Sequence, residues 1–354
     1  MTAVDTTADN ATAAGKLTAA ARDSVKTVIA ASMVGTAIEF YDFYASGTAA
    51  ANYFPTVFFS DTTNPTVALL LSLVTFAVAF IARPVGSLIF GHFGDRLGRK
   101  KTLVVSLMTM GVATFLIGCL PSYEQVGLLA VVILCLCRFV QGIGLGGEWS
   151  GAALVATENA PENKRALYGS FPELGAPIGF FLSNGTFFLL EAFNDSEAMM
   201  TWGWRVPFLL SAVLVVVGLV VRVHMEETPI FRMAQERNEV VKAPVVEVFR
   251  KSWVQVLQAT FLVAVTYTLF YTLATWSLAW GTKPVGQGGG GLGFTNQEYL
   301  LMLMVAVCVF ALFIVLSCVY ADRIGRRRVL TFSSVALVVF AVAFPYLLMG
   351  EGKR

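Results

Sequence analysis

The sequence predicts an all-α membrane protein with about nine transmembrane helices and a cytoplasmic N-terminus. Of its 354 residues, 56% are hydrophobic and only 14% are charged, whereas about a quarter of the residues of an average soluble domain are charged. The mean hydropathy is +0.70, so the chain has too few charges to cover the surface of a water-soluble protein. Its apolar residues gather in helix-length segments, and its basic residues gather in alternate loops between them.

Nine segments satisfy the length requirement of a membrane helix. A bilayer core about 30 Å thick needs roughly 20 mostly apolar residues at about 1.5 Å of rise each. The first, fourth and fifth segments contain ionisable residues, and the regular spacing of their neighbours supports them as spans. The predicted spans are 27–52, 66–90, 102–120, 126–150, 166–190, 205–223, 253–280, 299–320 and 329–349.

The distribution of Lys and Arg orients these spans. Most of the 25 basic residues lie in the segments 16–26, 96–101, 164–165, 222–251 and 323–328, which all fall on one side of the predicted membrane. Cytoplasmic loops carry the excess of Lys and Arg in membrane proteins. The N-terminus is therefore expected in the cytoplasm.

A long polar loop separates the spans into two sets. The first residues are rich in Ala and Thr and contain no apolar core, which predicts a disordered cytoplasmic tail and not a cleavable signal peptide. The predicted organisation is a tail (1–25), an N-terminal six-helix bundle (26–223), a central cytoplasmic linker (224–252) and a partial C-terminal bundle of three helices (253–354).

An internal repeat relates the two sets. The sequence GDRLGRKK at 94–101 returns as ADRIGRRR at 321–328, and each copy joins the second span of its set to the third. A six-span unit repeated in parallel would give twelve helices. We therefore expect a C-terminally truncated chain that lacks the last three.

Each copy of this loop is expected to hold two helices together at the cytoplasmic face. Glycines permit tight turns and close helix approach, and an aspartate is favoured near a helix N-terminus. A single copy could be a mere positive-inside cluster, but two copies at equivalent positions favour a structural latch. The residues concerned are Gly91, Asp95, Arg96, Gly98 and Arg99 in the first copy and Asp322, Arg323, Gly325 and Arg326 in the second.

The first loop copy, GHFGDRLGRKK, resembles the signature loop of the major facilitator superfamily. One departure from that pattern is the absence of three helices, and another is Cys318 in place of the first glycine of the second copy. Further segments resemble the metabolite:proton symporter subfamily: IEFYDFYASG (38–47), FIARPVGSLIFGHFGDRLGRK (80–100), RFVQGIGLGGEWSGAALVATENAP (138–161), YGSFPELGAPIGFFLSNG (168–185), WGWRVPFLLS (202–211) and EETPIF (226–231).

This resemblance implies a major facilitator fold, with about nine of twelve helices present, and a transport function. Members of the subfamily import organic acids or osmolytes such as α-ketoglutarate, shikimate, citrate, proline and betaine. We accordingly expect a monomeric, proton-coupled symporter for a small organic acid or zwitterionic osmolyte, without a cofactor, in the bacterial inner membrane. Its partners would be the substrate, protons and the lipid bilayer. The alternatives are a proton-driven exporter of the same fold and a truncated, non-transporting fragment.

Three ionisable residues are predicted at the same depth near the middle of the membrane. Glu39 and Arg138 each lie about 12 residues into their spans, and Asp42 shares a helix face with Glu39. An uncompensated charge there costs about 2.5–3.5 kcal/mol. Under one hypothesis Arg138 binds a substrate carboxylate, and Glu39 or Asp42 carries the coupled proton. Burial favours the protonated form of such a carboxylate, whereas pairing with the arginine favours the ionised form. The alternative is a permanent structural ion pair.

Other polar positions extend this predicted site. The tyrosines of the seventh span form a polar-aromatic stripe that could line a cavity, although such a stripe is as often ordinary packing. Charged residues nearer the cytoplasm could form a gate or a proton exit, with structural pairing as the alternative. The further candidates for substrate binding are Tyr41, Gln141, Tyr267 and Tyr271, and those for the gate are Arg83, Glu148 and Glu173.

A glycine motif in the fourth span points to packing and not to nucleotide binding. Gly142, Gly144 and Gly147 spell G-x-G-x-x-G, but they follow no predicted strand and open no phosphate-facing helix. Gly142 and Gly146 lie one turn apart and are expected to let a neighbouring helix approach closely.

Other classes of function lack the residues that they require. The five cysteines all lie in apolar stretches and fit no zinc or disulfide pattern, and only two histidines are present. We therefore expect no metal site and no enzymatic activity. The net charge of +2 gives no reason to expect nucleic acid as a partner.

Overall fold

The computed structural model describes residues 33–97, 99–147, 156–157, 160–223, 244–285 and 291–349, and all regular structure within these ranges is helical. A first helix spans residues 33–52. The labelled α-helices are α2 (Phe54–Phe58), α3 (Pro65–Leu97), α4 (Arg99–Gly118), α5 (Tyr123–Val126), α6 (Leu128–Gly146), α8 (Arg165–Phe193), α9 (Ser196–Thr201), α10 (Val206–Val223), α12 (Pro244–Tyr271), α13 (Ser277–Gly281), α14 (Asn296–Ile324) and α15 (Arg326–Met349). Short 3-10 helices span Glu162–Lys164 and Gly203–Arg205, and a π-helix spans Thr272–Trp276.

Eight of the described helices are long and apolar enough to cross a membrane. They correspond to the second to ninth predicted spans, and the helix at residues 33–52 corresponds to the first predicted span, 27–52. Residues 35–51 of that helix are all buried, because the surrounding helices enclose it. A helix enclosed by protein can hold carboxylates that lipid would exclude, which explains its weak hydropathy.

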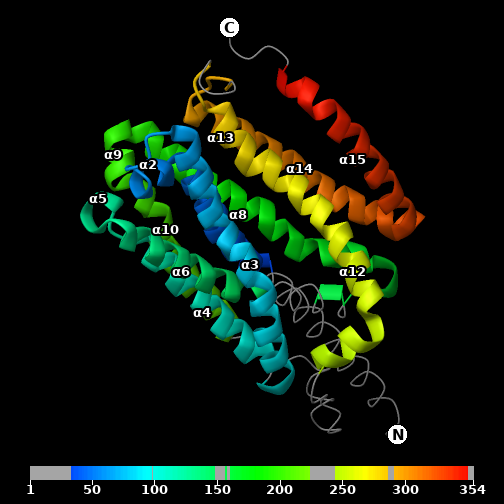
Figure 1. Cartoon of the computed structure of the whole chain (residues 1–354). Coiled ribbons are helices and arrows are strands. Elements are labelled where there is room, and N and C mark those ends of the chain that lie inside the picture. The colour runs from blue at the N-terminus through cyan, green and yellow to red at the C-terminus, as the bar shows by residue number, and fades with distance from the viewer. Residues whose placement is uncertain are drawn as a thin grey trace, which may run out of the picture.

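The helices gather in two groups (Figure 1). α3, α4, α6 and α10 pack together on one side, and α12, α14 and α15 lie on the other. α8 runs beside α14 and so joins the two groups along its length. α8 and α14 therefore border any path between the two groups.

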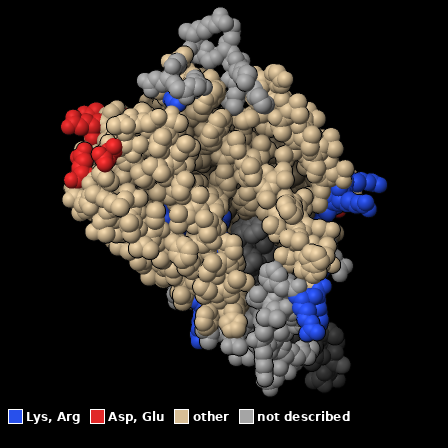
Figure 2. All heavy atoms as spheres, in the orientation of Figure 1, with Lys and Arg blue, Asp and Glu red and all other residues tan. Residues whose placement is uncertain are grey.

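Exposed charges mark the two ends of the molecule (Figure 2). Lys and Arg side chains gather where α12 begins and where α14 turns into α15, whereas Asp and Glu gather at the opposite end, near α5 and α9. A broad belt of uncharged side chains separates the two ends. This belt matches the expected bilayer position, and the basic end matches the expected cytoplasmic side.

Two of the predicted spans differ in detail from the observed helices. α12 begins at Pro244, inside the segment predicted as a linker, but its backbone is non-helical at Ser252 (φ −135°, ψ 25°). The straight portion therefore begins at Trp253, where the span was expected. The fourth span is divided by Gly127, whose φ of 61° separates α5 from α6.

Glycines set the close approach of α6 to its neighbours, as the sequence predicts. A Cβ atom on Gly142 would overlap the carbonyl oxygen of Ala79, and one on Gly146 would overlap that of Arg83, both on α3. Gly144 meets Met110 of α4 in the same way. The G-x-G-x-x-G pattern is therefore a helix-packing surface.

Candidate functional site

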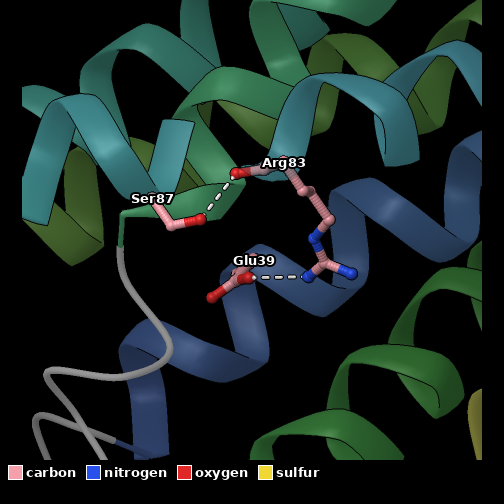
Figure 3. A network of polar contacts seen from close by, with 3 residues as sticks. All are labelled: Glu39, Arg83 and Ser87. Atoms are coloured by element: carbon pink, nitrogen blue, oxygen red, sulfur yellow. Dashed lines mark hydrogen bonds and ion pairs between the residues drawn. The ribbon is translucent and has the colours of Figure 1, made fainter. Parts of the chain in front are cut away.

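An ion pair joins the first helix to α3 (Figure 3). Arg83 Nη2 lies 3.4 Å from Glu39 Oε1. The Glu39 side chain is fully buried, whereas 20% of the Arg83 side chain is exposed. The Arg83 guanidinium also lies over the ring of Phe43, at 5.4 Å from its centroid. The prediction paired Glu39 with Arg138 and placed Arg83 in a cytoplasmic gate, so this contact is a different arrangement.

Arg138 lies in the interior of the first helix group and is fully buried. Its guanidinium donates to Gln141 Oε1 at 2.8 Å and to the Ser46 carbonyl at 3.1 Å. The ring centroids of Phe54 and Phe76 lie 5.9 and 5.5 Å from its Cζ. All of these contacts come from the N-terminal part of the chain.

Asp42 is also fully buried in this interior. Gln141, the partner of Arg138, donates to Thr114 Oγ1 at 2.9 Å, and the Thr114 and Ser211 hydroxyls approach the Asp42 carboxylate. Neither carboxylate oxygen of Asp42 nor Nε of Arg138 has a partner with hydrogen-bond geometry among the described residues. Asp42 and Arg138 thus border one polar group without a direct ion pair.

The predicted substrate-binding residues divide between two places. Tyr41 donates its hydroxyl to the Pro207 carbonyl of α10 at 3.1 Å, and Gln141 bonds Arg138, so both lie within the first helix group. Tyr267 and Tyr271 of α12 stack with ring centroids 6.1 Å apart. Tyr271 also packs on Phe80 at 4.9 Å, which places it at the junction of the two groups.

Aromatic residues that the sequence analysis did not single out complete this junction. Phe43 packs on Phe76, Phe80 and Tyr271 at centroid distances of 4.9, 5.2 and 5.5 Å. Phe76 and Phe80 are four residues apart on α3, a helical spacing that could have revealed them. Their contact with Tyr271 could not be predicted from residue spacing, because Tyr271 belongs to another helix, α12.

A cavity of about 570 Å³ adjoins this junction. Among the described residues Glu173 is its only charged lining residue, and Tyr267 also faces it. The lining otherwise consists mainly of apolar and aromatic side chains of the first helix, α8, α12, α14 and α15. Glu148, the expected partner of Glu173, lies outside the described residues.

The two loop copies are described unequally. Asp322 accepts hydrogen bonds from the backbone N–H groups of Ala166 (3.0 Å) and Leu167 (2.9 Å) at the start of α8. Gly325 ends α14 with a φ of 94°. Gly98 and the side chains of Asp95, Arg96 and Arg99 lie outside the described residues.

One expectation for the first copy is wrong. Gly91 was expected to permit a tight turn or a close helix approach, but it lies inside α3 and no described atom comes within 4 Å of its Cβ position. α3 continues helically through Leu97, because no proline and no glycine with a positive φ interrupts residues 91–97.

A polar cluster at the acidic end escaped the sequence analysis. Tyr53 and Asn296 both donate to Glu191 Oε1, and Asn52 donates to Asn296 Oδ1 at 2.7 Å. These residues join the end of the first helix, the end of α8 and the start of α14, beside a cavity of about 430 Å³. Isolated polar residues at helix ends give no sequence signal of such a cluster.

Comparisons with known proteins agree with the fold. The family described as "Sugar (and other) transporter" matches residues 27–273. The inner membrane metabolite transport protein YhjE of Escherichia coli K12 is 50% identical over 92% of this chain and 73% of its own length. The E. coli shikimate transporter is 36% identical over 91% of this chain and 72% of its own, and the proline/betaine transporter of Salmonella typhimurium is 32% identical over 91% and 64%.

The solved structure of the proton:xylose symporter XylE is similar in fold. It superposes with a TM-score of 0.64 at 17% identity, covering 85% of this chain and 70% of that one. XylE is a major facilitator superfamily protein. The predicted fold class is therefore confirmed.

Proposed function

Because this chain belongs to the sugar (and other) transporter family of the major facilitator superfamily, we propose that it is a proton-coupled symporter that imports a small organic acid or zwitterionic osmolyte by alternating access. Membership itself makes it a multi-pass metabolite transporter of the inner membrane and not an enzyme. Shikimate, proline and betaine, the solutes named for two relatives, all contain a carboxylate, and this shared group supports the proposed substrate class.

The observation that best supports coupling is the state of Asp42 and Arg138. Both are fully buried, and Asp42 has no hydrogen-bond partner among the described residues. A buried charge in a purely structural role is normally paired and hydrogen-bonded. A buried carboxylate that is held by no ion pair can exchange a proton without breaking one, so Asp42 is our candidate for the coupling residue.

Contacts at both ends of the α8–α14 pair support alternating access. At the basic end Asp322 binds the start of α8, and at the acidic end Asn296 binds Glu191. Transporters of this kind move one helix group against the other around a site near the middle of the membrane. Breaking one set of contacts while keeping the other would open the path to one side only.

Proton flux in proteoliposomes tests the proposal. With a pH-sensitive dye inside the vesicles, addition of a transported solute should acidify the lumen of vesicles that contain the unaltered protein. Asp42→Asn should abolish acidification while solute exchange across the membrane persists. Asp61→Asn, at an exposed carboxylate of the acidic end, serves as the matched control and should behave like the unaltered protein.

The outcomes separate the alternatives. Solute uptake without acidification in the unaltered protein would refute symport, and acidification that persists in Asp42→Asn would exclude Asp42 as the coupling residue. Alkalinisation of the lumen on solute entry would identify antiport, which is the coupling of a proton-driven exporter.

A further inference from the structure

We propose that Arg83 binds the carboxylate group of the transported solute, that Tyr271 of the opposite helix group completes this site, and that Glu39 occupies the guanidinium while no solute is bound. This inference rests on the proposed transport function and names the residues of its site. It assigns to Arg83 the role that the sequence analysis gave to Arg138.

Access to solvent distinguishes the two arginines. Arg138 is fully buried, and its guanidinium donates hydrogen bonds to Gln141 and to the Ser46 carbonyl. Arg83 is 20% exposed and lies where α3 meets α12. Only an arginine at the junction of the groups can meet a solute that enters from either side of the membrane.

Glu39 contacts only one terminal nitrogen of the Arg83 guanidinium. One terminal nitrogen faces Glu39, and the other points away from it (Figure 3). The distance of 3.4 Å to Glu39 is longer than the roughly 2.7–2.9 Å of a strong charge-assisted hydrogen bond. A solute carboxylate that binds Arg83 in two-pronged geometry would therefore gain more than the displaced Glu39 contact provides.

Tyr271 supplies the matching donor from the other helix group. Its hydroxyl lies beside the Arg83 guanidinium, yet it has no partner with hydrogen-bond geometry among the described residues. A buried hydroxyl without a partner costs about 1–3 kcal/mol. A carboxylate placed between Arg83 and Tyr271 would accept from both and remove that cost.

Aromatic rings define the surroundings of this position. Phe43 lies beneath the guanidinium, Phe80 packs against Tyr271, and Tyr267 stacks on Tyr271 and reaches the cavity of about 570 Å³. The apolar part of a solute would extend along these rings, with its carboxylate held at Arg83. Apolar walls with a few fixed polar groups are the usual composition of small-molecule sites.

The arrangement also connects binding to movement. Arg83 belongs to one helix group and Tyr271 to the other, so a bound carboxylate would hold the two groups together. A ligand shifts a conformational equilibrium only by its differential contacts with the two states.

Binding of matched solute pairs to the purified protein in lipid nanodiscs tests this inference. The probes are glycine betaine against choline, and shikimate against its methyl ester, because each second member lacks the carboxylate. We expect calorimetric binding of at least one acid and none of its partner. Arg83→Gln should weaken that binding about 30- to 150-fold, the loss expected for a charged hydrogen-bonded contact of about 2–3 kcal/mol, and Tyr271→Phe should weaken it several-fold.

Glu39→Gln should change the carboxylate affinity in the opposite direction. It removes the competing anion and keeps Arg83, so carboxylate affinity should rise about tenfold, and this expectation stands even if Arg83→Gln fails to fold. Lys101→Gln, at an exposed basic position of the cytoplasmic end, is the control and should leave affinity unchanged.

Three results would overturn the inference: no binding of either acid to the unaltered protein, unchanged affinity in Arg83→Gln, or unchanged or weaker affinity in Glu39→Gln. A failure of the proposed function looks different. In that case the affinities of the variants for the acids would change as expected, but vesicles with a pH gradient would accumulate no solute.

Discussion

Asp322 of α14 caps the first turn of α8 by accepting the backbone N–H of Ala166 at 3.0 Å, and its other oxygen accepts from Leu167 at 2.9 Å. The first N–H groups of a helix have no partner within the helix, and a carboxylate there is also favoured by the helix dipole. The cap is supplied by the opposite helix group. Part of the predicted latch is therefore a side chain of the repeated loop bound to a helix end across the junction.

Asp322→Ala should loosen this end of the molecule. It removes two charge-assisted hydrogen bonds from a half-buried position, which we expect to cost about 1–2 kcal/mol. Hydrogen exchange of the amides of Ala166 and Leu167 should accelerate, and thermal unfolding should begin a few degrees lower. Asp322→Asn keeps one acceptor oxygen, so its exchange rates and unfolding temperature should lie between those of the unaltered protein and of Asp322→Ala. Unchanged protection of both amides in Asp322→Ala would contradict the cap.

The order of the helices and the depth of the charged residues in the membrane could be predicted from the sequence. The direction in which each charged side chain points around its helix axis could not. Counting residues along a span placed Glu39, Asp42 and Arg138 at one depth, and the structure brings Asp42 and Arg138 to a common polar group. The partner of Glu39 is instead Arg83, because the rotation of α3 about its axis decides which side chain meets the first helix. That rotation is set by the packing of α3 against other helices, mainly α6 and α4.

The helix-packing glycines were predictable for a related reason. Gly142 and Gly146 are one turn apart on one span, so the local pattern contains the whole signal. The cluster of Tyr53, Glu191 and Asn296 depends on three segments far apart in the sequence. No single segment marks it.

Gly142→Ala should disrupt the contact of α6 with α3. The added methyl group would overlap the Ala79 carbonyl oxygen, and backbone cannot move aside as a flexible side chain can, so overpacking should cost about 1–3 kcal/mol or more. Gly91→Ala is the matched control on α3, since no described atom lies within 4 Å of its Cβ position. It should be neutral or stabilising by up to about 1 kcal/mol. Equal melting temperatures of the two variants in nanodiscs would contradict this account.

Tyr53→Phe should weaken closure at the acidic end. The Tyr53 hydroxyl donates to Glu191, which also accepts from Asn296, and burial together with the neighbouring Glu191 raises the pKa of Tyr53 above its ordinary value. The hydroxyl therefore stays protonated and remains a donor at physiological pH. Its removal should shift the population toward states open at this end.

Spin labels on the two sides of that end can measure the shift. Glu197 and Val285 are exposed positions on α9 and after α13, and the distance distribution between labels there should gain a longer component in Tyr53→Phe. Tyr123→Phe, which removes an exposed hydroxyl bonded only weakly to Asp61 at 3.4 Å, should leave the distribution unchanged. The same change in both variants would show that the cluster does not hold this end closed.

Gln141→Glu should uncouple transport from protons while stabilising the protein. Gln141 Oε1 lies 2.8 Å from Arg138 Nη1, so an isosteric glutamate would give Arg138 a permanent anionic partner in a fully buried position. The new carboxylate would also lie in the polar group that Asp42 borders through Thr114, so repulsion between like charges would keep Asp42 protonated throughout the cycle. We expect a melting temperature several degrees higher, retained solute exchange, and no acidification of vesicles on solute entry.

Gln141→Met, of similar size but without an acceptor, should instead lower the free energy of unfolding by about 1–3 kcal/mol. Acidification at the unaltered rate in Gln141→Glu would mean that Arg138 and Asp42 do not act on the same proton.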